Sequence, residues 1–220
     1  MKPKRESFFW TSYSDLMTSL FFIMLVLFIL AVLLQHNQLV KIGKEKEATE
    51  EQYRKIKEIE ESTKKINPKY FQYDEEFKRH TLKHIYVKFN RGKFNIEEIP
   101  QSERDKLVQA GKAIQEFLED ARENEITQNV QYLIIVEGQS SKDGYNTDNF
   151  HNNDVLSYQR ALALVNYWKL NGIDLEEDPS CEVLVSGSGQ RSKFREKPDG
   201  PNNEKNQRFV IHIIPKPGVR

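Results

Sequence analysis

An aspartate near the start of a long apolar run is the first feature of this sequence that could do chemistry. Residues 8–34 read FFWTSYSDLMTSLFFIMLVLFILAVLL, and from Leu20 to Leu34 no side chain is charged or strongly polar. An ionised carboxylate in hydrocarbon costs ~2.5–3.5 kcal/mol on insertion scales, so an acid in such a segment is a functional candidate. A carboxyl that alternates between neutral and ionised forms can carry a proton, and each proton that crosses ~100 mV releases ~2.3 kcal/mol. Asp15 is therefore a candidate cation relay.

Hydroxyl side chains accompany this aspartate. Four polar residues fall along one side of a regular helix: Thr11, Asp15, Thr18 and Ser19. Trp10 and Tyr13 are amphipathic aromatic residues of the kind that mark a membrane interface. The polar stripe is suited to face protein inside the bilayer. The alternative is that Asp15 lies at the interface as a helix N-cap with Ser12 and Ser14, where an acid is inexpensive.

The composition excludes several classes of function. Lysine and arginine number 33 and the acids 33, so a net charge of zero offers no global basic field to nucleic acid. Cys181 is the single cysteine, which excludes an intrachain disulfide and a cysteine-based zinc site. The histidines are dispersed, and GSGQ at 187–190 lacks the sequence of a phosphate loop. Because no nucleophile, base and orienting group come together, we expect no enzyme, no metal and no cofactor beyond a transported H⁺ or Na⁺.

The apolar run sets the expected membrane topology. Leu16–Leu34 comprises 19 residues, enough helix to span most of a ~30 Å hydrocarbon core. We expect a cytoplasmic tail at 1–10 and a transmembrane helix at 11–35. A signal peptide is the alternative, but its apolar region is usually ~7–15 residues, and the exit LLQHNQLVK has no small-x-small cleavage site. Lys2, Lys4 and Arg5 favour a cytoplasmic N-terminus, which places the chain after His36 across the membrane.

Residues 36–82 are expected to form a charged helical connector. The stretch 41–66 is rich in lysine and glutamate and has no proline, which favours a solvated helix. Only around Ile56 and Ile59 are both core positions of a heptad apolar, so a short parallel coiled coil and a single charged helix both fit the pattern.

A compact α/β (α+β) domain is expected over 83–215. Residues rich in β-branched and aromatic side chains predict strands at 83–89, 130–138, 181–187 and 208–215. Helical periodicity predicts helices at 100–121, with Ser102 as N-cap, and at 156–172, which ends at Gly172. This order indicates a sheet covered by helices on one face. Loops as long as 139–155 and 188–206 are usually functional or disordered.

The membrane segment resembles the start of the B subunits of ion-driven stator motors, whose pattern is roughly an aromatic residue followed by Tyr-Ala-Asp-Leu/Phe-Met-Thr. The matching residues are Trp10, Tyr13, Asp15, Leu16, Met17 and Thr18, with Ser14 in place of the alanine. In that family, which includes flagellar MotB and the ZorB subunit of Zorya anti-phage defence, the aspartate carries the ion between A and B subunits. The resemblance implies an ion relay at Asp15 and Thr18, and the wording FW-x-SY-x-DLMT is closer to ZorB. It also implies a homodimer inside a ring of multi-span A subunits in the bacterial inner membrane.

Residues 84–214 resemble the OmpA-like peptidoglycan-binding domains. NDVLSYQRA (153–161) fits the pattern N-x-x-L-S-x-x-R-A, EGQSSKDG (137–144) is similar to the loop E-G-H-T-D-x-x-G, and NQRFVIHI (206–213) is similar to the ending N-R-R-V-E-I. The resemblance implies a periplasmic domain in which Arg160 clamps a carboxylate of the wall peptide with two parallel hydrogen bonds. The candidate peptidoglycan-binding residues are Ser141, Asp143, Asn153, Arg160 and Arg208.

The sequence departs from that family's loop in three ways. Ser141 stands where the family has an aspartate, Gln139 where it has a histidine, and there are extra residues between Gly144 and Asn153. Asp143 is a candidate to supply the missing acid. Arg160 has the alternative role of a salt bridge that tethers the loop, and Arg208 is expected to pair within the fold.

Together these features predict the B subunit of a proton- or sodium-driven membrane motor in Zorya-type anti-phage defence. The folded domain would hold the subunit still against peptidoglycan while Asp15 acts on the ring of A subunits, and no direct nucleic-acid partner is expected. The alternatives are a flagellar MotB-type stator, a passive OmpA-like tether, and a transporter-coupling subunit of the ExbD or TolR kind. The last of these would lack the pattern N-x-x-L-S-x-x-R-A.

Overall fold

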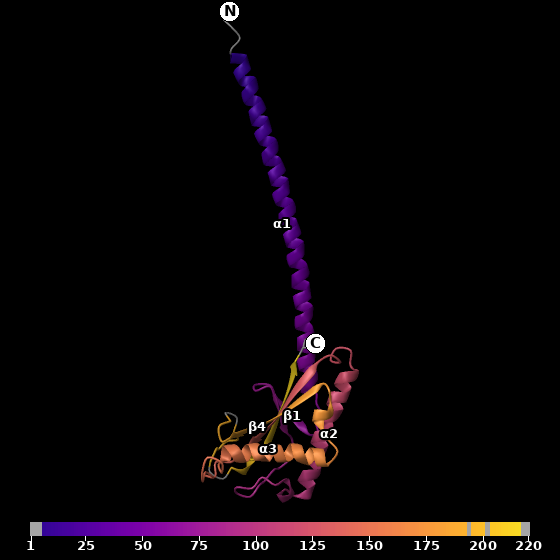
Figure 1. The fold of residues 1–220 in the computed structure, drawn as a ribbon, viewed down its shortest axis with the longest axis vertical. Helices are drawn as coiled ribbons and strands as arrows, with labels where there is room; N and C mark the ends of the chain where they lie inside the picture. The colour runs from indigo at the N-terminus through magenta and orange to yellow at the C-terminus, as the bar shows by residue number, and fades with distance from the viewer. Residues whose placement is uncertain (1–5, 193–194, 201–202, 217–220) are drawn as a thin grey trace, which may run out of the picture. The chain divides into compact units, whose positions relative to one another are not determined.

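The computed structural model describes residues 6–192, 195–200 and 203–216, which divide into two compact units, 1–54 and 55–220. A single helix, α1 (Glu6–Lys64), forms the described part of the first unit and continues into the second (Figure 1). The helix predicted at 41–66 is therefore present to Lys64, continuous with the apolar helix. Its lysine- and glutamate-rich sequence offers no proline that would end it earlier.

The apolar half of α1 is a candidate membrane span. Among the described residues it is the one helix long and apolar enough to cross a bilayer. No part of its most apolar stretch of 18 residues is buried within the structure. The core helix of a soluble domain would hide such a surface, whereas side chains such as Phe28 are 67% exposed here. A long apolar helix preceding a folded domain, as the sequence predicts, is confirmed.

The second unit contains a five-stranded mixed sheet with the order β1-β2-β5-β3-β4. The strands are β1 (Phe71–Asp74), β2 (Arg79–Leu82), β3 (Gln131–Gln139), β4 (Cys181–Gly189) and β5 (Phe209–Lys216). The longer helices are α2 (Gln101–Glu123) and α3 (Asn153–Leu170), and single turns of 3₁₀ helix lie at Ile96–Glu98, Leu175–Glu177 and Glu204–Asn206. β3 and β4 are parallel and joined through α3, while the other pairs are antiparallel. The predicted α/β class is confirmed.

The beginning of the domain differs from the prediction. The segment 83–89 is not a strand: His84 has φ of 57°, and the residues after it lie outside the sheet. Its amides bond to side chains instead, Tyr86 to Glu103 at 2.8 Å and Phe89 to Gln207 at 2.8 Å. The hairpin β1–β2 takes the sheet position beside β5. The boundary predicted at residue 83 is therefore too late, because this hairpin lies inside the range assigned to the connector.

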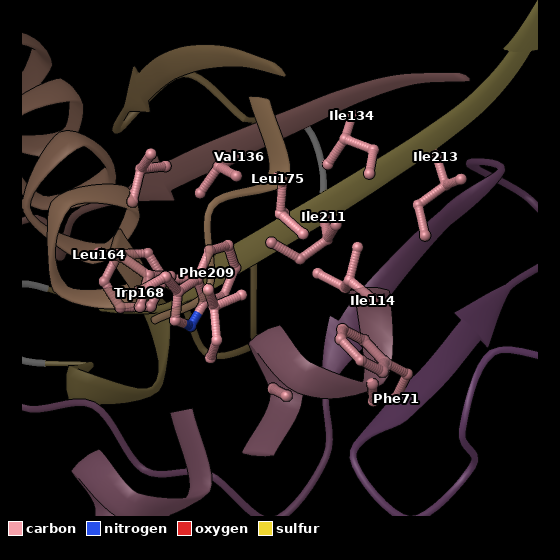
Figure 2. Close-up of a cluster of buried hydrophobic side chains, with 14 of the residues drawn as sticks. Phe71, Ile114, Ile134, Val136, Leu164, Trp168, Leu175, Phe209, Ile211 and Ile213 are labelled. Carbon is pink, nitrogen blue, oxygen red and sulfur yellow. The ribbon is translucent and has the colours of Figure 1, made fainter. Parts of the chain in front are cut away.

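The core lies between the sheet and α2 and α3, as Figure 2 shows for the labelled side chains. Tyr132, Ile134 and Val136 alternate along β3 and are buried, while Leu184 and Ile214, on the opposite face of the sheet, are 45% and 42% exposed. The helices thus cover one face, as predicted. The apolar stripe predicted for α2 is buried, and the indole of Trp168 donates to Leu107 O at 2.7 Å.

The predicted helix ends differ in outcome. Gly172 has φ of 77° and follows α3, so the predicted glycine cap is confirmed. Ser102 is not the N-cap of α2, because the helix begins at Gln101 after Pro100, and Pro100 makes no side-chain cap. A proline immediately before the first helical residue already fixes the backbone there.

The last turn of α1 packs on the domain through His80. The His80 imidazole is buried and lies 2.9 Å from Thr63 O, which can only accept, so its Nε2 carries the proton. Burial lowers the pKa of His80 to about 4, and the ring is neutral at physiological pH. A neutral histidine thus joins the end of this helix to β2.

Candidate functional site

The centre of the candidate site is Arg160, which projects from α3. Its side chain is 2% exposed, its Nε donates to Lys93 O at 3.0 Å, and its guanidinium lies 4.4 Å from the centroid of the Phe89 ring. The two Nη atoms make no hydrogen bond to any residue that the structure describes, yet they are not sealed from solvent. Burial lowers the pKa of Arg160 to about 10, so the group stays charged at neutral pH. A buried cation with open donors is a site for an anion.

Asp143 acts on this guanidinium by its charge, and Asn153 is bonded to Asp143. Asp143 Oδ1 accepts from Asn153 Nδ2 at 2.8 Å and from Tyr145 N at 3.0 Å. The charge of Asp143 opposes the lowering of the Arg160 pKa, although the two form no ion pair within 4.0 Å. Asn153 is 5% exposed, and its Oδ1 has no partner among the described residues. The structure thus brings together three of the predicted residues, and the salt-bridge alternative for Arg160 is not what it shows.

Ser141 is linked to this group through Gln207 and is part of the packed interior. It is 3% exposed, and its hydroxyl accepts from Gln207 Nε2 at 3.3 Å. The same Gln207 side chain accepts from Phe89 N, so Ser141 helps to position the ring under the guanidinium. A buried serine in this position supplies no negative charge, and the acid nearest to Arg160 among the predicted residues is Asp143.

Arg208 is engaged elsewhere in the domain. Its Nε donates to Gln139 Oε1 at 2.9 Å and its Nη1 to Glu196 Oε1 at 3.0 Å. Burial lowers the pKa of Arg208, which is partly offset by Glu196. These contacts confirm the expectation that Arg208 pairs within the fold.

Glu137, the acid that opens the predicted loop, ties three strands together. Its carboxylate accepts from His212 at 2.9 Å, from Ser188 at 2.5 Å and from Gln139 at 2.9 Å. Burial alone would raise the pKa of Glu137, but these hydrogen bonds lower it to about 2. The carboxylate is therefore ionised, and it accepts hydrogen bonds from side chains of its own domain.

Asp15 and Thr18 lie in the apolar helix. Because α1 begins at Glu6, Asp15 is in the third turn and is not the N-cap that the alternative required. The depth of Asp15 in a bilayer stays a prediction. The hydroxyls of Thr18 and Ser19 donate to Ser14 O at 2.7 Å and to Asp15 O at 2.6 Å. Both hydroxyls therefore bond to backbone carbonyls of α1. The Asp15 carboxylate has no hydrogen bond or ion pair to any described residue.

Some residues that build the site were not predicted. Phe89 and Lys93 contact Arg160 but follow no motif spacing. Gln207, which bonds to Ser141 and Phe89, lies inside the quoted segment NQRFVIHI but was given no role from the sequence. Among the described residues, no group of three or more histidine, cysteine, aspartate or glutamate side chains could hold a metal ion.

No protein-family model and no curated protein matches this sequence. Among solved structures, the chain is similar to the OmpA-like domain of FopA1 from Francisella tularensis, with 18% identity over 67% of this chain and 79% of that one and a TM-score of 0.40. The periplasmic domain of Helicobacter pylori MotB gives 16% identity over 65% and 79%, with a TM-score of 0.43. A putative MotB-like protein from Desulfovibrio vulgaris gives 14% identity over 76% and 96%, with a TM-score of 0.45. At such values, what the chain binds has to be inferred from its own residues.

Proposed function

We propose that this chain is the B subunit of an ion-driven membrane motor and that its folded domain holds it to peptidoglycan. The observation that carries the proposal is Arg160, a charged and buried guanidinium whose Nη atoms make no hydrogen bond to any described residue. Asp143 and Glu98 act on this cation by their charge but form no ion pair with it within 4.0 Å, so its open donors are best satisfied by an anionic ligand.

The neighbours of Arg160 favour one end of a wall peptide as that ligand. A carboxylate can accept two parallel hydrogen bonds from the planar guanidinium. Asp143, which lies close by, is suited to an ammonium group. A peptide end that carries both a carboxylate and an amine satisfies both side chains, and the stem peptides of bacterial walls present such ends.

In this proposal the apolar helix with Asp15 forms the ion-driven part of the motor. Asp15 has no partner within its own helix, so its carboxyl needs other subunits to shelter it in the bilayer. We assign these roles to a second copy of the chain and to a ring of multi-span A subunits in the bacterial inner membrane. H⁺ or Na⁺ passing through Asp15 would turn the ring only if this subunit is held still, which is the purpose of the wall contact.

We assign the motor to Zorya-type anti-phage defence because the sequence pattern FW-x-SY-x-DLMT around Asp15 is closer to that of ZorB. The N-terminus then lies in the cytoplasm and the folded domain in the periplasm, as Lys2, Lys4 and Arg5 favour. A phage-plating assay tests this assignment. Cells that carry the native gene cluster should resist phage, and Asp15→Asn should abolish resistance without altering swimming.

The wall contact and the membrane contact are tested separately. The full chain in detergent should be retained on purified sacculi, and a multi-span membrane protein should copurify with it from native membranes. Retention without a membrane partner, together with an Asp15→Asn variant of full activity in cells, would replace the motor with a passive tether. Failure to bind sacculi would overturn the wall half of the proposal.

A further inference from the structure

An open groove of about 600 Å³ adjoins the Arg160 site. It is lined by Gly144–Asn146, by Asn152–Asp154 at the start of α3, and by Gln190 and Arg191 after β4. Its size is within the ~300–1,000 Å³ typical of small-molecule sites, but about half of its lining surface is polar, whereas most such sites are lined mainly by apolar atoms. Asn153 belongs both to the groove and to the cluster around Arg160.

The loop that forms one wall is held in place by its own hydrogen bonds. Asn146 and Asn152 pair across its base, and the Asp148 carboxylate accepts from Phe150 N at 2.7 Å and His151 N at 2.8 Å. These are the extra residues between Gly144 and Asn153. The groove is therefore a built feature of this chain.

The amides of the groove differ in whether they are already used. Asn152 is fully occupied: its Oδ1 caps α3 by accepting from Asp154 N and Val155 N, and its Nδ2 donates to Asp148 O and Asn149 O. In contrast, the side chains of Asn146 and Gln190 have no hydrogen-bond partner among the described residues, and neither has the buried Asn153 Oδ1. Each free amide offers both a donor and an acceptor to a ligand.

The groove carries no net charge. Its two charged lining residues, Arg191 and Asp154, form an ion pair with each other. A charged ligand therefore gains little here, and an apolar ligand would leave the amides unsatisfied. The lining fits a neutral molecule with many hydroxyl and amide groups.

We propose that this groove binds an N-acetylated amino sugar of the wall glycan while Arg160 holds the carboxylate of the attached peptide. The inference rests on the proposed function, because the shared Asn153 places the two sites side by side and the wall joins sugar and peptide covalently. It adds a glycan contact, formed by Asn146 and Gln190, to the peptide contact.

Calorimetric titration of the full chain in detergent tests this inference with three probes: a disaccharide-peptide, the same peptide without sugar, and the peptide-free glycan. Two amide contacts predict that the wild-type chain binds the disaccharide-peptide about tenfold or more tightly than the free peptide. The double variant Asn146→Ala, Gln190→Ala should lose this difference and keep its affinity for the free peptide. Gln115→Ala, which removes an amide of α2 outside the groove, should behave as wild type.

The outcomes separate the groove from the peptide clamp. Equal binding of the two peptides by the wild-type chain, or a sugar preference that survives in the double variant, overturns the glycan contact and leaves the clamp. Binding of the peptide-free glycan without any binding of the free peptide supports the groove and overturns the clamp. Binding of none of the three probes overturns both.

Discussion

Replacing Arg160 with lysine is the sharpest perturbation of the wall contact. Lysine keeps the positive charge and most of the aliphatic stem, but it lacks the planar pair of donors. In the structure the two Nη atoms are the free donors, and Nε is committed to Lys93 O. The substitution therefore removes the geometry of the proposed clamp while leaving a cation in place.

The expected size of the effect follows from the number of bonds lost. A carboxylate that receives two charge-assisted hydrogen bonds from arginine receives one from lysine, and each such bond contributes ~1.5–3 kcal/mol. Affinity for the wall peptide should fall roughly 10- to 150-fold. The lost contacts with Lys93 O and the Phe89 ring should lower the free energy of unfolding by about 1–3 kcal/mol, which leaves a typical domain folded.

Retention on sacculi and calorimetric titration with a free stem peptide measure this effect. Arg122→Ala is the matched control, because Arg122 lies near the end of α2, pairs with Asp178 and is 43% exposed. Near-ultraviolet circular dichroism shows whether each variant is folded. An Arg160→Lys chain that is folded and binds the peptide as tightly as wild type would refute the clamp and make Arg160 a structural residue.

Three further predictions address the membrane helix, the junction and the core. Asp15→Asn should insert and copurify with its partner normally but conduct no ions in proteoliposomes, whereas Asp15→Glu should retain conduction; flux through the Asn variant would contradict the relay. His80 takes up a proton near pH 6.5 when unfolded but only near pH 4 when folded, so the free energy of unfolding should fall by on the order of 3 kcal/mol as the pH drops through this window. Chemical unfolding can be followed by the fluorescence of Trp168 in a Trp10→Phe background. In this assay His80→Gln should flatten the change of the free energy of unfolding with pH, and an unchanged pH dependence would contradict the role of His80. Gly138→Ala should lower stability by at least ~1–3 kcal/mol because the new Cβ would lie 2.0 Å from Ser157 O, while Gly43→Ala, with open space around it, should not destabilise; equal melting temperatures would disprove the close packing.

The elements with strong periodicity could be predicted from the sequence, and the weak ones could not. The buried face of α2 and the apolar runs of β3 and β5 follow directly from residue pattern. The hairpin β1–β2 has four-residue strands rich in polar side chains, so nothing marks it as part of a sheet. The segment 83–89 has strand-like composition, but a left-handed residue at its start and side-chain partners for its amides keep it out of the ladder.

The candidate site shows the same division. Motif spacing identified Asp143, Asn153 and Arg160, which the structure brings together. The supports of Arg160 could not be found in this way, because Phe89 and Lys93 reach it only through the tertiary fold. The sequence also left open whether Asp15 caps its helix, which depended on where that helix begins.

Imaging of the chain purified with its membrane partner, at a resolution that shows carboxylates, tests the motor most directly. The proposed relay predicts that the Asp15 carboxyl lies inside the bilayer, within hydrogen-bond reach of a helix from another subunit. A carboxyl in bulk water, with no companion helix beside it, would contradict the relay and leave only the attachment to the wall.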